Sequence, residues 1–81
     1  MKLNERQTPA IQVLERVFTL LDVLAAHDDA VPLKLISERT ALHPSTAHRI
    51  LNDLVVGGFV DRPHAGAYRL GMRLLELGNL V

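Results

Sequence analysis

The chain has 81 residues, the size of one small domain, and 48% of them are hydrophobic, enough for a compact core. It contains no cysteine, which excludes disulfides and thiolate metal sites and fits a reducing cytoplasm. It shows neither a signal peptide nor an apolar run long enough to span a membrane, so we expect no membrane partner.

Charge is unevenly distributed, although the formal net charge is zero. Residues 1–30 hold three Lys or Arg against five Asp or Glu, a balance of −2, whereas residues 31–81 hold six against four, a balance of +2. Phosphate neutralisation supplies most non-specific affinity for DNA. We therefore expect a single copy of the domain to bind DNA poorly.

The N-terminal third predicts an arm and a long helix. Residues 1–9 are polar and end in a proline, which predicts a flexible N-terminal arm. From Ala10 to Ala26 a narrow polar stripe recurs at helical spacing. The apolar arc beside it is wider than one small core covers from one side. Two interpretations stay open, a central core helix or a helix that also meets a second subunit.

The middle of the chain predicts two helices joined by a short turn. Val31–Leu33 is expected to form a short edge strand, because an edge tolerates proline. A helix over Lys34–Thr40 and a turn over Ala41–His43 follow, and the turn has helix-turn-helix length. Pro44 suits the first position of a further helix, which should reach about residue 56 before two glycines give a left-handed exit.

The predicted helix over residues 44–56 has two distinct sides. At helical spacing, one side is apolar and should face the core, with Ala47, Ile50, Leu51 and Leu54. The opposite side carries small polar and cationic groups, with Ser45, His48, Arg49 and Asn52. This is the combination that a helix needs to lie in a DNA major groove.

The C-terminal third predicts a β-hairpin and a last helix. Residues 59–62 and 67–70 are strand-like, and residues 63–66 between them are turn-like. A final helix begins at Met72. The order of elements predicts a mainly α domain with a small β-hairpin, a winged helix-turn-helix.

Three segments together resemble the N-terminal DNA-binding domain of IclR-family bacterial transcription regulators: Ser45–Leu51, Gly58–Val60 and Tyr68–Gly78. The resemblance covers about residues 10–81. The chain departs from the family pattern at Ala41, where the family usually has glycine, and at Pro44, where it often has a polar or basic side chain. The second departure removes one expected DNA contact.

The resemblance implies a cytoplasmic repressor or activator that binds promoter DNA at a pseudo-palindromic operator as a homodimer or higher homo-oligomer. Residues 10–71 would form the winged helix-turn-helix DNA-binding domain. Residues 72–81 would begin a linker helix toward an effector-binding domain outside this chain. A small-molecule effector would act only through that domain.

The candidate DNA contacts on the predicted recognition helix each have an ordinary alternative. Ser45 and Thr46 lie in its first turn, where free N–H groups and the helix dipole attract phosphate, but they also simply favour a helix start. Arg49 has the geometry to bond guanine, worth about 1–3 kcal/mol, or to pair with Asp53. His48 is a further candidate for donation to phosphate or base, and Asn52 for a contact with adenine or the backbone, with a solvated polar residue as its alternative.

The predicted hairpin supplies the remaining candidates. Arg62 and Arg69 are expected to flank its turn, with His64 at the tip, where they would meet phosphates or a minor groove. The alternative is a charged edge that prevents strand aggregation. Tyr68 is expected in the core, because a single aromatic side chain makes no stacking platform for bases.

A dimer interface is expected along the two apolar terminal helices, with Val13, Val17, Leu20, Leu24, Leu74 and Leu77. The alternative function is a winged-helix protein–protein interaction or dimerisation module that never touches DNA, which the zero net charge favours. The sequence offers no catalytic residue pair, and its histidine spacing matches no zinc pattern. We therefore predict no enzyme activity, no metal and no cofactor.

Overall fold

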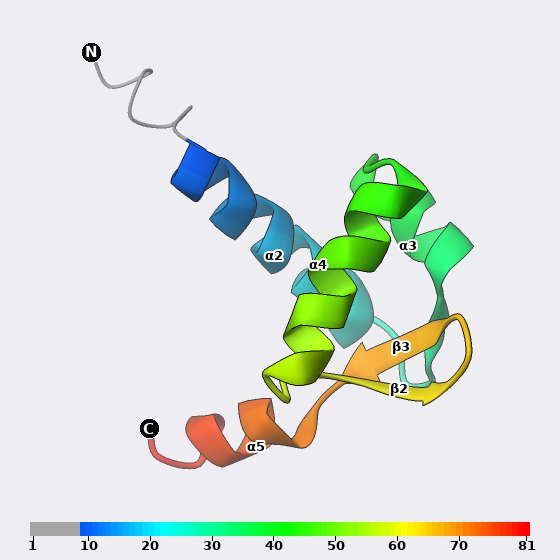
Figure 1. Ribbon diagram of the computed structural model, residues 1–81. Coiled ribbons are helices and arrows are strands. Elements are labelled where there is room, and N and C mark those ends of the chain that lie inside the picture. Colours follow the sequence, from blue (N-terminus) through cyan, green and yellow to red (C-terminus); the bar gives the residue numbers. More distant parts are fainter. Residues whose placement is uncertain (1–8) are drawn as a thin grey trace.

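The computed structural model describes residues 9–81 (Figure 1). Four helices and three strands follow one another as α2 (Pro9–Ala25), β1 (Val31–Pro32), α3 (Leu33–Thr40), α4 (Pro44–Val56), β2 (Val60–His64), β3 (Ala67–Leu70) and α5 (Met72–Gly78). The predicted mainly α fold with a winged helix-turn-helix arrangement is confirmed.

The helix boundaries lie close to those that the sequence predicts. α2 begins at Pro9, so this residue does not belong to the predicted arm; residues 1–8 lie outside the described part of the chain. α4 has the predicted bounds, and the left-handed residue that follows it is Gly58, with φ 83°. α5 begins at Met72 as expected and ends at Gly78.

The three strands form one antiparallel sheet in the order β1-β3-β2. The predicted edge strand is present but ends at Pro32, because Leu33 already belongs to α3. The Leu33 N–H donates to the carbonyl of Gly66 at 2.9 Å. The hairpin turn is therefore attached to the start of α3.

The hairpin turn is shorter than the sequence predicts. β2 continues to His64, which pairs with Ala67, so the turn consists of Ala65 and Gly66 alone. Gly66 adopts φ 78°, a conformation that glycine reaches without strain and that allows a two-residue reversal. The strand register shifts between Asp61 and His64, where Pro63 has no N–H to donate.

The core lies between α2, α3, α4 and the sheet, which contact one another (Figure 1). Tyr68 is buried, as predicted. The side chains enclosed with it come from every one of these elements: Leu20, Leu24, Val31, Ile36, Ala47, Ile50, Leu51 and Val60. Leu35 is partly buried and packs against this core.

The apolar side chains of α2 have two kinds of surroundings. Leu20 and Leu24 are 0% and 2% exposed within a single copy of the chain, so their assignment to a dimer interface is wrong. Their side chains are already fully enclosed by the core. In contrast, Leu14 and Phe18 are 52% and 57% exposed, and the N-terminal end of α2 extends away from the body of the domain (Figure 1).

Gly71 joins the sheet to α5 through a very close backbone approach. Its N–H donates to the carbonyl of Phe59 at 2.8 Å, and a Cβ atom at this position would collide with the carbonyl oxygen of Gly58. Beside this contact the guanidinium of Arg73 lies 5.3 Å from the centre of the Phe59 ring, within cation–π range. The end of α4 and the start of α5 are thus held together.

We expect Gly71→Ala to lower the free energy of unfolding by about 1–3 kcal/mol, because the added methyl group must displace backbone. Urea denaturation followed by circular dichroism measures the change. Gly78→Ala is the matched control: a Cβ atom there meets nothing within 4 Å. Equal stability of the two variants would contradict the close approach at Gly71.

Candidate nucleic-acid interface

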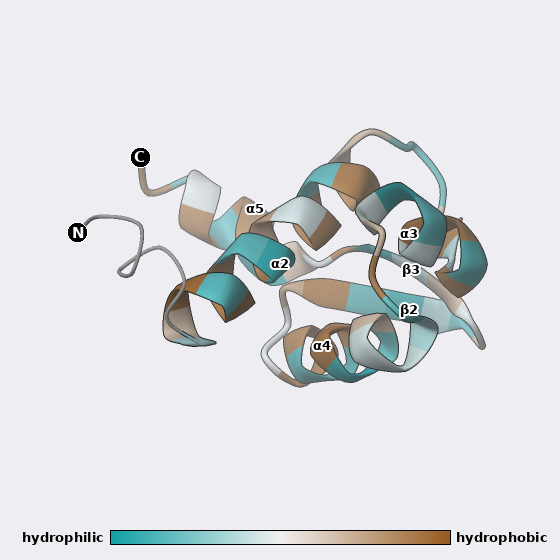
Figure 2. Ribbon diagram, turned by 90° about the horizontal axis from the view of Figure 1, so that it is seen from above, coloured by the Kyte–Doolittle hydropathy of each residue, from teal (hydrophilic) through white to brown (hydrophobic). Residues whose placement is uncertain are grey.

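α4 lies at one edge of the molecule, with the other described elements on its inner side (Figure 2). Ala47, Ile50 and Leu51 face inward and are buried. Ser45, His48 and Arg49 are exposed, while Thr46 and Asn52 are half-buried. The two-sided helix that the spacing predicts is therefore present, with its polar side turned to solvent.

Arg49 is an exposed cation in the middle of this polar side. Within residues 9–81 neither Arg49 nor Asp53 makes an ion pair, so the predicted alternative of an Arg49–Asp53 pair is absent here. On the same side of α4, Nδ2 of Asn52 lies 3.5 Å from Nε2 of His48, which precedes it by one helical turn. Among the described residues the guanidinium of Arg49 has no acceptor, so its donors are open to an external partner.

The first turn of α4 is capped by a residue outside the predicted candidates, His43. Its Nδ1 accepts a hydrogen bond from the Ser45 N–H at 3.1 Å and lies 2.9 Å from Ser45 Oγ. The Ser45 N–H is thus not free for phosphate, contrary to expectation. In the described part of the chain, no protein acceptor is found for the next N–H, that of Thr46.

A sequence signal for His43 exists but is weak. A proline at the first helical position places the residue before it at the N-cap, where an acceptor side chain is favoured. Histidine is not among the usual N-cap residues. Its role became visible only from the position of its ring.

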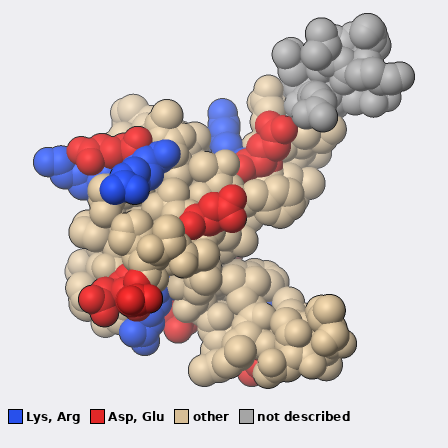
Figure 3. Space-filling model, turned by 180° about the vertical axis from the view of Figure 1, so that it is seen from behind, with Lys and Arg blue, Asp and Glu red and all other residues tan. Residues whose placement is uncertain are grey.

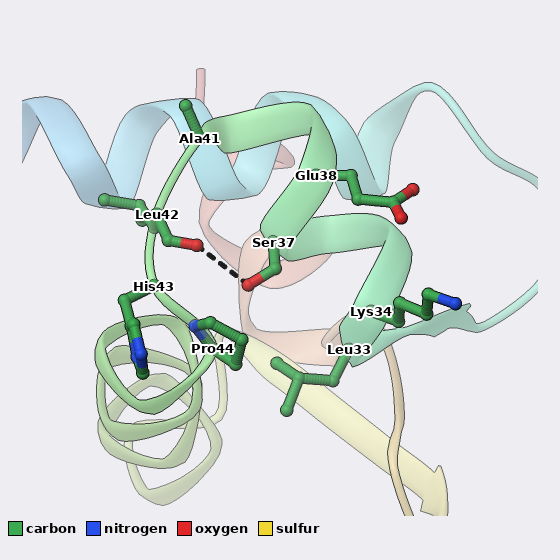
Figure 4. A pocket seen from close by; sticks show the side chains of 8 residues that line it. All are labelled: Leu33, Lys34, Ser37, Glu38, Ala41, Leu42, His43 and Pro44. Atoms are coloured by element: carbon green, nitrogen blue, oxygen red, sulfur yellow. Dashed lines mark hydrogen bonds between the residues drawn. The ribbon is translucent and has the colours of Figure 1, made fainter.

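The turn between α3 and α4 keeps a left-handed residue although alanine occupies the position. Ala41 adopts φ 60° and ψ 20°. Side chains on α3 hold the turn: Ser37 Oγ donates to the Leu42 carbonyl at 2.8 Å (Figure 4), and the Leu42 N–H donates to Thr40 Oγ1 at 3.3 Å. These bonds stabilise a backbone conformation that a Cβ atom disfavours.

A hollow of about 740 Å³ lies beside this turn (Figure 4). Its lining comes from α3, the turn and the start of α4: Leu33, Lys34, Ser37, Glu38, Ala41, Leu42, His43 and Pro44. It borders the first turn of the exposed helix.

The hairpin holds its three candidate residues on the surface, at different distances from its turn. Arg62, His64 and Arg69 are all exposed. His64 directly precedes the turn, but Arg69 lies opposite Asp61, towards the base of the hairpin. Two residues separate Arg62 from the turn and two separate Arg69 from it, so the two arginines flank the turn at equal distance along the chain.

The face of the molecule behind α4 carries charges of both signs (Figure 3). There acidic and basic side chains are interspersed, and the projecting lobe at the C-terminal end is almost free of charge (Figure 3). Residues 9–81 contain no cluster of three or more His, Asp or Glu side chains placed to hold a metal ion. Among the same residues no helix is both long and apolar enough to cross a membrane.

A short helix, a tight turn, an exposed polar helix and a hairpin define a winged helix-turn-helix DNA-binding domain. Residues 13–64 match the IclR helix-turn-helix domain, so the chain belongs to the IclR family of transcriptional regulators. Its relatives are named as regulators: the HTH-type transcriptional regulator XynR, a glycerol operon regulatory protein and the DNA-binding transcriptional repressor YiaJ.

Individual relatives agree with this assignment. The chain is 41% identical to the HTH-type transcriptional regulator XynR of Escherichia coli over 76 residues, which cover 90% of the chain and 29% of XynR. An IclR homologue from Microbacterium sp. strain HM58-2 superposes with a TM-score of 0.75 at 38% identity, covering 84% of this chain and 29% of that one.

A second solved structure, an IclR homologue from Microbacterium hydrocarbonoxydans complexed with 4-hydroxybenzoate, is 40% identical with a TM-score of 0.72. That match covers 80% of this chain and 27% of the homologue. The chain thus spans roughly three tenths of the length of these relatives.

We expect Ala41→Gly to raise the free energy of unfolding by about 0.5–1 kcal/mol, because relief of the left-handed strain exceeds the entropic cost of glycine. Thermal and urea unfolding measure it. The same change at Ala25, in the last turn of α2, should instead lower stability. A loss of stability in both variants would show that Ala41 is unstrained.

Proposed function

We propose that the chain binds a specific double-stranded promoter sequence, with α4 in the major groove. The observation that carries the proposal is the side of α4 turned to solvent, where Ser45, His48 and Arg49 are exposed and Arg49 pairs with no anion of residues 9–81. The buried opposite side of α4 fixes this orientation. The IclR helix-turn-helix match covers the whole of α4.

Arg49 is the residue we assign to base recognition. A guanidinium presents two parallel donors that match O6 and N7 of guanine in the major groove. Thr46 and Asn52 border it on the same helix and are assigned to phosphate or base contacts. Thr46 suits phosphate, since its N–H lies at the positive end of the helix dipole and has no protein acceptor within residues 9–81.

The hairpin is assigned to the DNA backbone or the minor groove. Arg62 and His64 are exposed near its turn and would make these contacts. Arg69 is also exposed and lies as far from the turn along the chain as Arg62, so we assign it the same kind of contact.

We further propose that the chain acts as a homodimer or higher homo-oligomer. Two copies of α4 about 34–36 Å apart would then face successive major grooves of a pseudo-palindromic operator. The exposed apolar side chains suit a subunit interface: Val13, Leu14 and Phe18 on α2, and Met72, Leu75 and Leu77 on α5. Of the remaining residues predicted for this interface, Val17 and Leu74 are half-buried.

The rest of the regulator would supply control of DNA binding. The chain corresponds to roughly three tenths of its relatives, one of which was solved with 4-hydroxybenzoate. We propose that this domain acts within a longer repressor or activator. A small molecule bound elsewhere in that protein would shift its affinity for the operator.

We expect Arg49→Ala to weaken binding to the selected operator by about 1–3 kcal/mol and to relax the preference at one base pair. Selection from random duplexes, followed by titration at several salt concentrations, measures both effects. Arg16→Ala removes the same charge from α2 and should leave the preference unchanged.

Recovery of a palindromic motif that depends on Arg49 supports recognition through α4. If the chain enriches no sequence even at low salt, the proposal fails and the protein–protein interaction module becomes the better account. A motif that Arg49→Ala leaves unaltered would remove this residue from base recognition.

We expect Phe18→Glu to shift the chain towards monomer and to weaken operator binding at least about tenfold, because it places a charge in the proposed apolar interface. Sedimentation velocity and DNA titration measure the two effects. Thr19→Glu adds the same charge to the neighbouring exposed position and is the control. Unchanged mass and affinity for Phe18→Glu would exclude this part of α2 from the interface.

A further inference from the structure

The contact between His43 and Ser45 restricts how Ser45 can bond to DNA. His43 Nδ1 lies 3.1 Å from the Ser45 backbone nitrogen and 2.9 Å from Ser45 Oγ. One ring nitrogen thus meets both the backbone and the side chain of the same residue. Both residues are exposed at the outer end of α4, where the proposed function places DNA.

The backbone determines the hydrogen position on the ring. An N–H group only donates, so Nδ1 must accept from the Ser45 N–H and carries no hydrogen of its own. The ring hydrogen is then on Nε2. Because a bare Nδ1 only accepts, the Ser45 hydroxyl donates its hydrogen to Nδ1 at 2.9 Å.

We propose that His43 is a positioning residue that makes Ser45 a hydrogen-bond acceptor toward DNA. With its hydrogen directed at Nδ1, the Ser45 hydroxyl presents only oxygen lone pairs to the groove. It therefore pairs with a donor, and the donors on base edges in the major groove are the amino groups of adenine and cytosine. Guanine O6 and N7, thymine O4 and phosphate oxygens are all acceptors and are excluded.

The inference rests on the proposed function and makes it more specific. The hydroxyl of a solvent-exposed serine rotates freely, so it donates or accepts and contributes little discrimination between bases. The hydrogen bond to His43 Nδ1 uses the hydroxyl hydrogen, so the Ser45 hydroxyl no longer donates to DNA. His43 thereby affects base preference without touching a base itself.

The hydrogen position on the ring can be tested without DNA. Nitrogen-15 NMR of the histidine rings in the 81-residue chain distinguishes a bare Nδ1 from a protonated one. We expect the His43 ring to carry its hydrogen on Nε2 at neutral pH. A hydrogen on Nδ1 would overturn the inference and leave the proposed function untouched.

The effect on base preference is tested by selection from random duplexes with four proteins: the parent chain, Ser45→Ala, His43→Ala and His43→Asn. The parent should prefer adenine or cytosine at one position of each half-site, and Ser45→Ala should lose that preference. His43→Ala frees the hydroxyl to donate, so guanine and thymine should become acceptable at the same position.

His43→Asn separates positioning from simple helix capping. Asparagine is a good N-cap whose carbonyl oxygen accepts from both the Ser45 N–H and its hydroxyl, so the preference of the parent should be kept. Loss of the cap alone would lower affinity for all sequences equally. A uniform loss in His43→Ala with an unchanged motif would therefore overturn the inference, whereas absence of a motif in the parent would overturn the proposed function and this inference together.

Discussion

Burial of one side of α4 is the constraint on which the rest of the structure depends. Ala47, Ile50 and Leu51 are enclosed by α2, α3 and the sheet, so rotation of α4 about its axis would expose them to water. The cost of such exposure is about 25 cal/mol per Å² of apolar surface. The polar side of α4, with Arg49 at its centre, is consequently held outward on a rigid support.

The ends of α4 are fixed by local hydrogen bonds. At the N-terminus His43 takes the place of the usual Ser, Thr, Asp or Asn cap, and Ser37 on α3 bonds the carbonyl of Leu42 in the turn just before it. At the C-terminus the Phe59 N–H bonds the Leu54 carbonyl, and Gly71 packs against the same junction. These contacts fix the relative positions of the turn, α4 and the hairpin.

The predictions from sequence succeeded where a single periodic element decided the outcome. The bounds of α4 follow from Pro44 at its first position and a glycine pair at its end, and its buried side follows from helical spacing. The resemblance to the IclR family likewise rested on contiguous residues and is confirmed by the match over residues 13–64. Periodicity alone, however, did not separate the two interpretations of α2. Its apolar arc is enclosed at Leu20 and Leu24 but open at Phe18, because one side of the helix packs against the core and Phe18 lies on another side.

The sequence by itself thus determined the class of fold, the order of its elements and the side of α4 that carries polar groups, because these depend on local spacing and capping preferences. The tertiary structure decided which apolar residues remain exposed, that the hairpin turn is only two residues long, and that His43 engages Ser45. Those features depend on how separate elements pack, on strand register and on side-chain direction. None of these three is encoded in the spacing of residues within one element.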